Sequence, residues 1–284
     1  MAEHTVKAFT EELDGLTQEV ARMGGMAEAA VNDCLVAVAR RDTELAHAVM
    51  ERDAKIDAAQ REVEKRAIKL FALRQPMASD LRVVLTAWRI AGELERVGDL
   101  AKNIAKRALI LNQAEPIQLT RSVERMGKIA GAHLKQVLDA YANKDVQAAI
   151  GVWMQDDNID AHYNSLFREL LTYMIEDPRM ISSCAHLLFI AKNIERIGDH
   201  GTNIAEYIHF LVTGEEIATR EPSVHWSGTK ALFSMVIGGT TKNDYSPVYW
   251  QIYEVSGIGK GEPVSIRRLP QHADNNNVSP LYGT

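Results

Sequence analysis

The amino-acid sequence contains an internal repeat with a period of about 100 residues. The segment 42–58 aligns without gaps on 145–161, and seven residues are identical in the two copies. Further along, the segment 91–105 aligns on 191–205, and each copy contains the motif Glu-Arg-(Val/Ile)-Gly-Asp. Because repeated segments fold into repeated structural units, this pattern predicts two similar halves in tandem.

Each half has the hydrophobic pattern of helices that pack in a bundle. Between residues 83 and 108, apolar side chains recur at alternating steps of four and three, and the same spacing returns over 190–211. The pattern predicts six helices, at about 5–40, 43–73, 77–113, 118–143, 145–175 and 180–213. We therefore expect an all-α fold made of two tandem three-helix bundles that arose by internal duplication.

The composition changes after about residue 214, and this change sets the domain boundaries. Five of the eight prolines follow this point, together with Trp226, Trp250 and a β-favouring stretch at 248–253. We expect the last part of the chain to be irregular, disordered or a small β unit, and we derive no function from it. The predicted domains are 5–114 for the first bundle, 115–215 for the second and 216–284 for the tail.

Charge and hydropathy exclude several classes of protein. The net charge of −6 and the lack of a basic stripe argue against a nucleic-acid-binding protein. The polar N-terminus and the lack of an apolar run of about 20 residues predict a cytoplasmic protein with at most peripheral membrane association. Cys34 and Cys184 stand apart within apolar patterns, so we expect two buried thiols in a reducing compartment rather than a disulfide or a zinc site.

Paired carboxylates are the candidate functional residues. Glu95 and Asp99 are four residues apart, so they share one face of their helix. Asp53 and Asp57 have the same spacing on the preceding helix, and consecutive helices joined by a short turn run antiparallel, so the two pairs can face each other. The second copy offers the corresponding residues Asp156, Asp160, Glu195 and Asp199.

Four converging carboxylates favour a bound cation. Like charges in close proximity destabilise a helix pair, and a cation removes this repulsion. Ligands that are all oxygen atoms suit hard ions such as magnesium, calcium, manganese or iron. The alternative is a set of solvated carboxylates on the bundle surface.

Gly98 and Gly198 each precede the motif aspartate within a helix, where glycine costs about 1 kcal/mol relative to alanine. They predict a close approach to the backbone, either by an ion or by a neighbouring helix.

The signs of an enzyme are weak. Glu44 and His47 form a single Glu-x-x-His pair, whereas di-iron carboxylate enzymes use two such pairs that point into the bundle core. The second copy has Gln147 and Ile150 at these positions. The chain also lacks a Walker loop, a Gly-x-Ser-x-Gly motif and a dinucleotide fingerprint. We therefore expect no catalytic residue and no enzymatic activity.

These motifs resemble those of the PhoU family of phosphate-transport accessory proteins. The resemblance rests on Arg-Gln-Pro-Met-Ala-Ser-Asp-Leu-Arg at 74–82 and on the two Glu-Arg-(Val/Ile)-Gly-Asp motifs, each followed by Asn-Ile-Ala, and covers about 5–215. It implies two similar three-helix bundles whose acidic motifs bind iron, manganese or magnesium. Carried over by position, the implied ligands are Asp53, Asp57, Glu95, Asp99, Asp156, Asp160, Glu195 and Asp199.

The resemblance also implies a regulatory role. Members of this family connect the ATPase subunit of the Pst phosphate transporter to a membrane-bound sensor histidine kinase, and they suppress the Pho regulon when phosphate is plentiful. They are commonly homodimers. This chain departs from the family pattern at Leu100, where the first motif usually has histidine, and in the tail from about residue 221.

Three hypotheses follow for the function. The leading one is a metal-binding regulatory adaptor of phosphate uptake and phosphate-starvation signalling. The second is a metal-free helical scaffold whose carboxylates recognise a basic partner surface. The third is a carboxylate-bridged metal oxidase.

Overall fold

The computed structural model describes residues 2–116, 119–215, 223–224, 230–236, 250–256 and 265–268, and the side chains of 8–116, 119–155 and 158–215. Contacts divide the chain into two units, residues 1–216 and 217–284. The two repeat copies belong to the first unit, so its division into halves at residues 114 and 115 stays a prediction.

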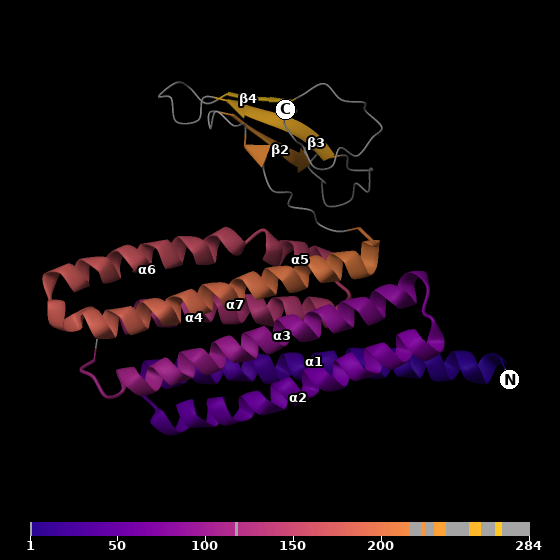
Figure 1. Cartoon of the computed structure of the whole chain (residues 1–284), viewed down its shortest axis with the longest axis horizontal. Coiled ribbons are helices and arrows are strands. Elements are labelled where there is room, and N and C mark those ends of the chain that lie inside the picture. The colour runs from indigo at the N-terminus through magenta and orange to yellow at the C-terminus, as the bar shows by residue number, and fades with distance from the viewer. Residues whose placement is uncertain are drawn as a thin grey trace. The chain divides into compact units, whose positions relative to one another are not determined.

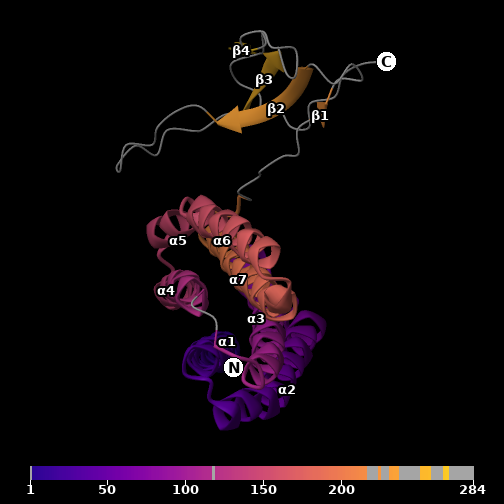
Figure 2. The ribbon, with the colours of Figure 1, turned by 90° about the vertical axis from the view of Figure 1, so that its left-hand side faces the viewer.

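The first unit consists of two helical bundles that lie side by side (Figures 1 and 2). The first bundle contains α1 (Ala2–Arg40), α2 (Thr43–Arg74) and α3 (Ala78–Leu111). The second contains α4 (Thr120–Asn143), α5 (Val146–Trp153), α6 (Asp156–Glu176), a 3-10 turn η1 (Pro178–Met180) and α7 (Ile181–Thr213). The predicted all-α fold with two related bundles is confirmed.

The repeat builds the same helix-to-helix turn in both halves. Arg41 and Lys144 both adopt a left-handed backbone conformation, with φ of 57° and 52°. The next residue, Asp42 or Asp145, caps the following helix by accepting a hydrogen bond from the backbone N–H of Leu45 (2.9 Å) or Ala148 (3.0 Å). Such caps stabilise a helix by about 1 kcal/mol, so these two identical aspartates explain why α2 and α5 begin where they do.

The predicted helix at 145–175 is wrong in one respect, because the structure divides it into α5 and α6. The break falls at Met154 and Gln155. Gly151 lowers helix propensity just before the break, and the two acidic residues 156 and 157 suit the first turn of a new helix. The first copy has alanine at the position of Gly151, and α2 continues without interruption.

Helices α3 and α7, the two copies of the motif helix, pack against each other along the middle of the unit (Figure 1). Arg82 Nε donates to the carbonyl oxygen of Leu211 (3.2 Å), Glu93 contacts His200, and Arg107 Nη1 lies 3.2 Å from His186 Nδ1. Residue numbers rise along α3 as they fall along α7, so the two copies are antiparallel. Their motifs therefore lie near the centre of the unit.

The predicted apolar seams form the core of the first unit. Leu94 and Ile194, which occupy corresponding positions, are 0% and 1% exposed. Cys34 and Cys184 are both buried free thiols, as expected. Burial raises the pKa of the Cys34 thiol, which keeps it protonated and unreactive.

The second unit contains an antiparallel four-stranded sheet. Its strands are β1 (Ser223–Val224), β2 (Lys230–Val236), β3 (Trp250–Ser256) and β4 (Ser265–Arg268), in the order β1-β2-β3-β4. Strands β2 and β3 pair over their full length, from Lys230 opposite Ser256 to Val236 opposite Trp250. In the described part of the chain, none of the helices has the length and apolarity required to cross a bilayer.

Candidate metal centre

The first candidate site lies between α2 and α3. Asp53 projects from the buried side of α2, and its side chain is only 4% exposed. Its Oδ2 accepts a hydrogen bond of 2.5 Å from Nζ of Lys102 on α3, and the same Nζ lies 3.7 Å from Asp99 Oδ1. The other oxygen of Asp53, Oδ1, is buried and has no hydrogen-bond partner. The site thus has a single ammonium group between carboxylates of two helices.

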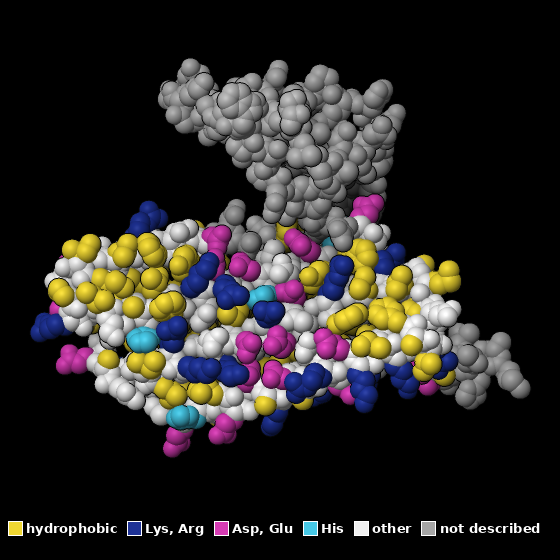
Figure 3. Space-filling model, in the orientation of Figure 1, with side chains coloured by type: hydrophobic (Ala, Val, Ile, Leu, Met, Phe, Trp, Pro, Cys, Tyr) yellow, Lys and Arg dark blue, Asp and Glu magenta, His cyan; other side chains and the backbone are white. Residues whose placement is uncertain are grey.

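The remaining carboxylates of the first half belong to the same electrostatic cluster. Burial raises the pKa of Glu95, and the negative charges of Asp99, Asp57 and Asp53 raise it further, against the opposing effect of Arg96. Hydrogen bonding to Asp53 raises the pKa of Lys102, so this ammonium stays charged. The four residues predicted for the first half are therefore close enough to act on one another electrostatically, and Lys102 contacts two of them, Asp53 and Asp99. Acidic side chains gather near the middle of the face formed by α2 and α3 (Figure 3).

The second candidate site is arranged differently. Glu195 is 12% exposed, and its Oε1 accepts a hydrogen bond of 2.6 Å from Lys192 Nζ on the same helix. Its Oε2 is buried without a hydrogen-bond partner. Lys192 also lies over the ring of Tyr163 from α6, with Nζ 5.3 Å from the ring centroid. The glutamate, a lysine and an aromatic ring therefore form the described centre of this site.

Of the predicted aspartates of the second half, the structure describes the side chains of two. Asp160 is exposed on α6, and Asp199 is partly buried on α7. Hydrogen bonding to Glu195 raises the pKa of Lys192, and the charge of Asp199 contributes to that rise. Asp156 is the first residue of α6, but its side chain lies outside the described residues.

In the part of the chain that the structure describes, neither site has an arrangement that binds a metal ion without side-chain movement. Among the described side chains, no group of three or more Asp, Glu, His or Cys residues is positioned to ligate one ion. The donor set nevertheless fits a hard cation, because the unpartnered oxygens of Asp53 and Glu195 are buried carboxylate oxygens. A buried polar atom without a partner costs about 1–3 kcal/mol. Each site therefore retains one costly oxygen that a cation can satisfy.

The two motif glycines allow the preceding helix to approach closely. A Cβ atom on Gly98 would lie 2.9 Å from Cδ1 of Ile56 and 3.6 Å from Oδ1 of Asp53. A Cβ atom on Gly198 would lie 2.7 Å from Cδ1 of Ile159, the residue that corresponds to Ile56. Of the two explanations for the glycines, helix packing is thus visible in both halves. In the first half, the same packing places Asp53 beside the motif helix.

A carboxylate that the sequence analysis missed joins the two halves. Oε2 of Glu93 on α3 lies 2.6 Å from Nδ1 of His200 and accepts a hydrogen bond of 3.1 Å from Asn203. Its Oε1 accepts a hydrogen bond of 3.3 Å from the hydroxyl of Tyr207. Burial opposes ionisation of Glu93, but these donors lower its pKa overall. One signal could have revealed this contact, namely that His200 replaces the apolar Leu100 of the first copy.

The oxidase hypothesis receives no support from the Glu-x-x-His pair. Glu44 and His47 are both exposed on α2, whereas the ligands of di-iron bundle enzymes point into the core. Arg96 follows Glu95 in the first motif; its side chain is 66% exposed, and its Nε lies 3.6 Å from Oε2 of Glu95.

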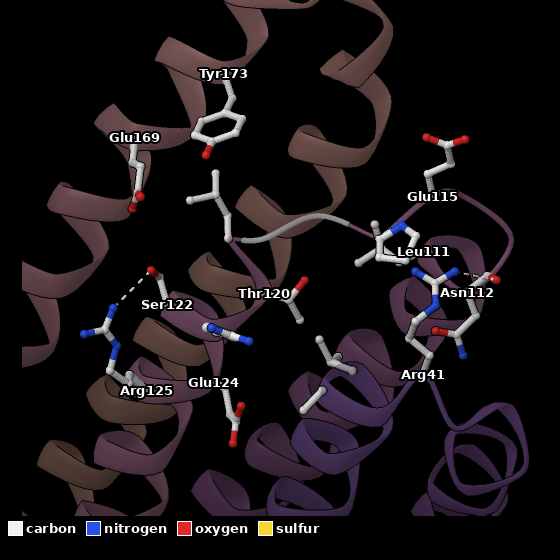
Figure 4. A pocket seen from close by; sticks show the side chains of 15 residues that line it. Arg41, Leu111, Asn112, Glu115, Thr120, Ser122, Glu124, Arg125, Glu169 and Tyr173 are labelled. Atoms are coloured by element: carbon white, nitrogen blue, oxygen red, sulfur yellow. Dashed lines mark hydrogen bonds between the residues drawn. The ribbon is translucent and has the colours of Figure 1, made fainter.

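A separate cavity of about 610 Å³ lies where the α1–α2 turn meets α4 and α6 (Figure 4). Arg41 donates to the carbonyl oxygens of Asn112 and Ala114, so it holds the connection that leaves α3. Arg125 donates to Ser122. Three arginines line the cavity together with three glutamates, so their charges balance and offer no clear anion site.

Comparison with known proteins identifies the helical unit. Residues 20–108 and 123–208 each match the PhoU domain. The chain is 60% identical over 225 residues to the phosphate-specific transport system accessory protein PhoU homolog of Caulobacter vibrioides strain NA1000, covering 79% of this chain and 98% of that protein. The homolog from Rhizobium meliloti strain 1021 is 48% identical, with coverage of 80% and 96%.

Solved structures show the same fold. The crystal structure of PhoU from Pseudomonas aeruginosa superposes with a TM-score of 0.71 at 36% identity, covering 73% of this chain and 100% of that one. The phosphate transport system regulatory protein PhoU from Streptococcus pneumoniae gives a TM-score of 0.69 at 30% identity, with coverage of 74% and 99%. These names describe accessory and regulatory proteins rather than enzymes. By its two matched domains, its relatives and its fold, the chain belongs to the PhoU family.

Proposed function

We propose that this protein is a regulatory accessory protein of a phosphate-specific transport system and that it binds metal ions at its two carboxylate sites. The observation that carries the metal assignment is Asp53, whose 4%-exposed carboxylate has one oxygen without a partner beside three further carboxylates. A charged group is rarely buried unless it is paired or coordinates a metal. A hard cation satisfies this oxygen and reduces the repulsion among the four negative charges.

The two sites would use corresponding residues of the repeated sequence. Asp53, Asp57, Glu95 and Asp99 would hold an ion between α2 and α3. Glu195 and Asp199 would form the second site, with Asp156 and Asp160 from α6. Because all these ligands supply oxygen, iron, manganese or magnesium ions suit the sites, and a bound ion would brace each motif helix against its neighbour.

The regulatory part of the proposal follows the family. The relatives are named for the phosphate-specific transport system, which supports a role beside a phosphate transporter. As partners we propose the ATPase subunit of the Pst transporter and a sensor histidine kinase, with the protein acting as a homodimer. Through these contacts it would repress phosphate-starvation genes when phosphate is plentiful.

Metal analysis of purified protein tests the chemical part of the proposal. The double variant Asp99→Ala, Asp199→Ala should contain much less iron, manganese or magnesium than wild type. The matched control is Asp14→Ala, Asp139→Ala, which removes one exposed aspartate from each half outside the sites. Equal metal content in all three proteins would show that the ligand assignment is wrong.

Gene expression tests the regulatory part. Deletion of the gene should raise expression of phosphate-starvation genes in phosphate-rich medium, and wild-type protein should restore repression. Unchanged expression after deletion would contradict the regulatory role, whatever the metal content.

A metal-free scaffold is the second candidate, and Lys102 and Lys192 favour it. Each lysine already forms an ion pair with a predicted metal ligand of the chain, Asp53 or Glu195, so the sites are partly satisfied without an ion. In this case the remaining carboxylates would bind a basic partner surface. Partner binding that weakens steeply with salt but does not respond to chelators would favour the scaffold.

A further inference from the structure

In each half, a lysine is bonded to a predicted metal ligand, namely Lys102 to Asp53 and Lys192 to Glu195, but the two lysines occupy different positions in the repeat. Lys102 follows Asp99 by three residues, and the second copy has Thr202 there. Lys192 precedes Glu195 by three residues, and the first copy has Gly92 there. Duplication of one sequence therefore does not account for the presence of both lysines. Each half has its own source of positive charge at the carboxylate cluster.

Lys102 lies between two of the carboxylates that would hold a metal ion at the first site. Its Nζ bonds to Oδ2 of Asp53 on α2 and lies 3.7 Å from Oδ1 of Asp99 on α3. An ammonium in this place links the same two helices that a metal ion would link. It carries a single positive charge, however, and leaves Asp53 Oδ1 without a partner.

The ion pair of Lys192 with Glu195 is more exposed than that of Lys102 with Asp53. Lys192 bonds to Glu195 within α7 and is 48% exposed, whereas Lys102 is 29% exposed and bonds to the buried Asp53. Solvent screens the more exposed pair, so less free energy is lost when Lys192 moves away. The long, flexible stem of lysine allows either ammonium to swing out of its site.

We propose that Lys102 and Lys192 are internal counter-ions that hold the two sites together without metal and that an incoming metal ion displaces them. This inference rests on the proposed metal-binding function. We take it that a site binds metal only after its lysine has moved away. Its apparent affinity for metal then equals the intrinsic affinity multiplied by the fraction of molecules in which the lysine has moved. Each lysine therefore weakens metal binding in its own half, and Lys102 does so more than Lys192.

Metal titration of lysine variants tests this competition. Lys102→Met is made in an Asp199→Ala parent, in which only the first site is intact. Lys192→Met is made in an Asp99→Ala parent, in which only the second site is intact. Each lysine variant is compared with its own parent. Each protein is titrated by calorimetry with Mn²⁺, Mg²⁺ and, without oxygen, Fe²⁺. Lys102→Met should bind at least one ion about tenfold more tightly, which corresponds to ~1.4 kcal/mol, and Lys192→Met should gain less.

Thermal unfolding supplies a second readout that does not depend on affinity. In the presence of a chelator, Lys102→Met should melt below its parent, because the carboxylates lose their counter-ion. Saturating metal should remove this deficit. Lys106→Met, which removes an exposed lysine one turn further along α3, is the matched control and should behave like its parent in both assays. If Lys102→Met does not fold, Lys102→Gln keeps a hydrogen-bond donor and removes the charge.

The outcomes separate this inference from the function on which it rests. If the parent binds metal and the Lys102 variant binds it equally or more weakly, the counter-ion role is wrong and the metal site stands. If neither the parents nor the lysine variants bind any of the three ions, both are wrong. Binding by the lysine variants alone would give the strongest support to displacement.

Discussion

The first carboxylate site joins two helices, whereas the described contacts of the second lie mainly along one helix. In the first half, Asp53 of α2 is bonded to Lys102 of α3. In the second half, Glu195 and its partner Lys192 both belong to α7, and Asp160 of α6 is exposed. The motif helices themselves remain close copies, with Leu94 and Ile194 equally buried. The difference shows that apolar packing has stayed similar in the two halves while their charged surfaces have diverged.

The helix before each motif explains much of this divergence. Asp53 lies within α2, a continuous helix of 32 residues, where packing buries it. Its counterpart Asp156 is the first residue of α6, after the break that follows α5. Identical residues in two aligned copies can thus occupy a helix interior in one copy and a helix start in the other.

Core truncations should have the largest effect and should affect the two halves alike. Leu94→Ala and Ile194→Ala should each lower the free energy of unfolding by about 2–5 kcal/mol, because each leaves a cavity at a fully buried position. Urea denaturation followed by circular dichroism measures both. Ile175→Ala, at a side chain that is 81% exposed, is the control and should change stability by less than about 0.5 kcal/mol. A large loss in only one half would contradict the idea of equivalent cores.

Removal of metal should distinguish the two sites. Chelation should lower the free energy of unfolding by about 2.7 kcal/mol for each site that was held at 100 times its dissociation constant. In the Asp53→Asn variant, chelation should lower the free energy of unfolding much less than in wild type. The effect of Asp160→Asn should be smaller, because Asp160 is exposed. Urea denaturation with and without EDTA measures the difference. Equal responses of the two variants would contradict the proposed inequality of the sites.

The contact between the halves should depend on Glu93 and not on its counterpart. Glu93→Ala removes the acceptor for His200, Asn203 and Tyr207 and should cost about 1–3 kcal/mol, since partly buried donors lose their partner. Asn193→Ala, at the corresponding position of the second copy, should cost less. Chemical denaturation of the two variants provides the comparison, and a larger loss for Asn193→Ala would overturn it.

The smallest expected effect concerns ion pairs near the ends of α2 and α6. Arg74 binds Glu12 of α1 through two hydrogen bonds of 2.8 and 2.9 Å, whereas Arg179 binds the nearby Asp177. The hydrogen bond from Arg74 lowers the pKa of Glu12 below its usual 4.5, so this pair stabilises the fold above that pH and loses its effect as the pH falls.

Arg74→Met should therefore reduce stability slightly at neutral pH and low salt, and the difference from wild type should vanish in acid and shrink in high salt. Arg179→Met should change stability even less, because its pair is local and exposed. Thermal melting at pH 7 and below pH 4 measures both variants. A difference between Arg74→Met and wild type that is independent of pH would show that the ion pair is not its cause.

Much of the fold could be predicted from the sequence because the repeat and the helical periodicity both depend on local patterns. The two aspartate caps and the buried seams of α3 and α7 follow directly from residue type and spacing. The break between α5 and α6 was missed because it depends on a balance of small propensity differences around Gly151, while the apolar pattern continues across it.

The candidate site could be predicted only in part. Spacing placed Asp53, Asp57, Glu95 and Asp99 together, since antiparallel neighbours bring such pairs face to face. The lysines were missed because their role depends on side-chain reach: Lys102 extends to the helix before it, and Lys192 folds back along its own helix. Glu93 was missed because its partners come from the other half of the chain, about 110 residues away.

The antiparallel pairing of α3 and α7 makes the helical unit resemble a dimer within one chain, because the two copies of the motif helix pack against each other. The short connection after α3 keeps the halves at the high effective concentration that a tether provides. Two first halves would place Leu100 opposite Glu93, and the glutamate would lose the partner that His200 supplies. If the two halves were separate chains, a first half should therefore associate more tightly with a second half than with another first half. The Glu93–His200 contact would favour this pairing.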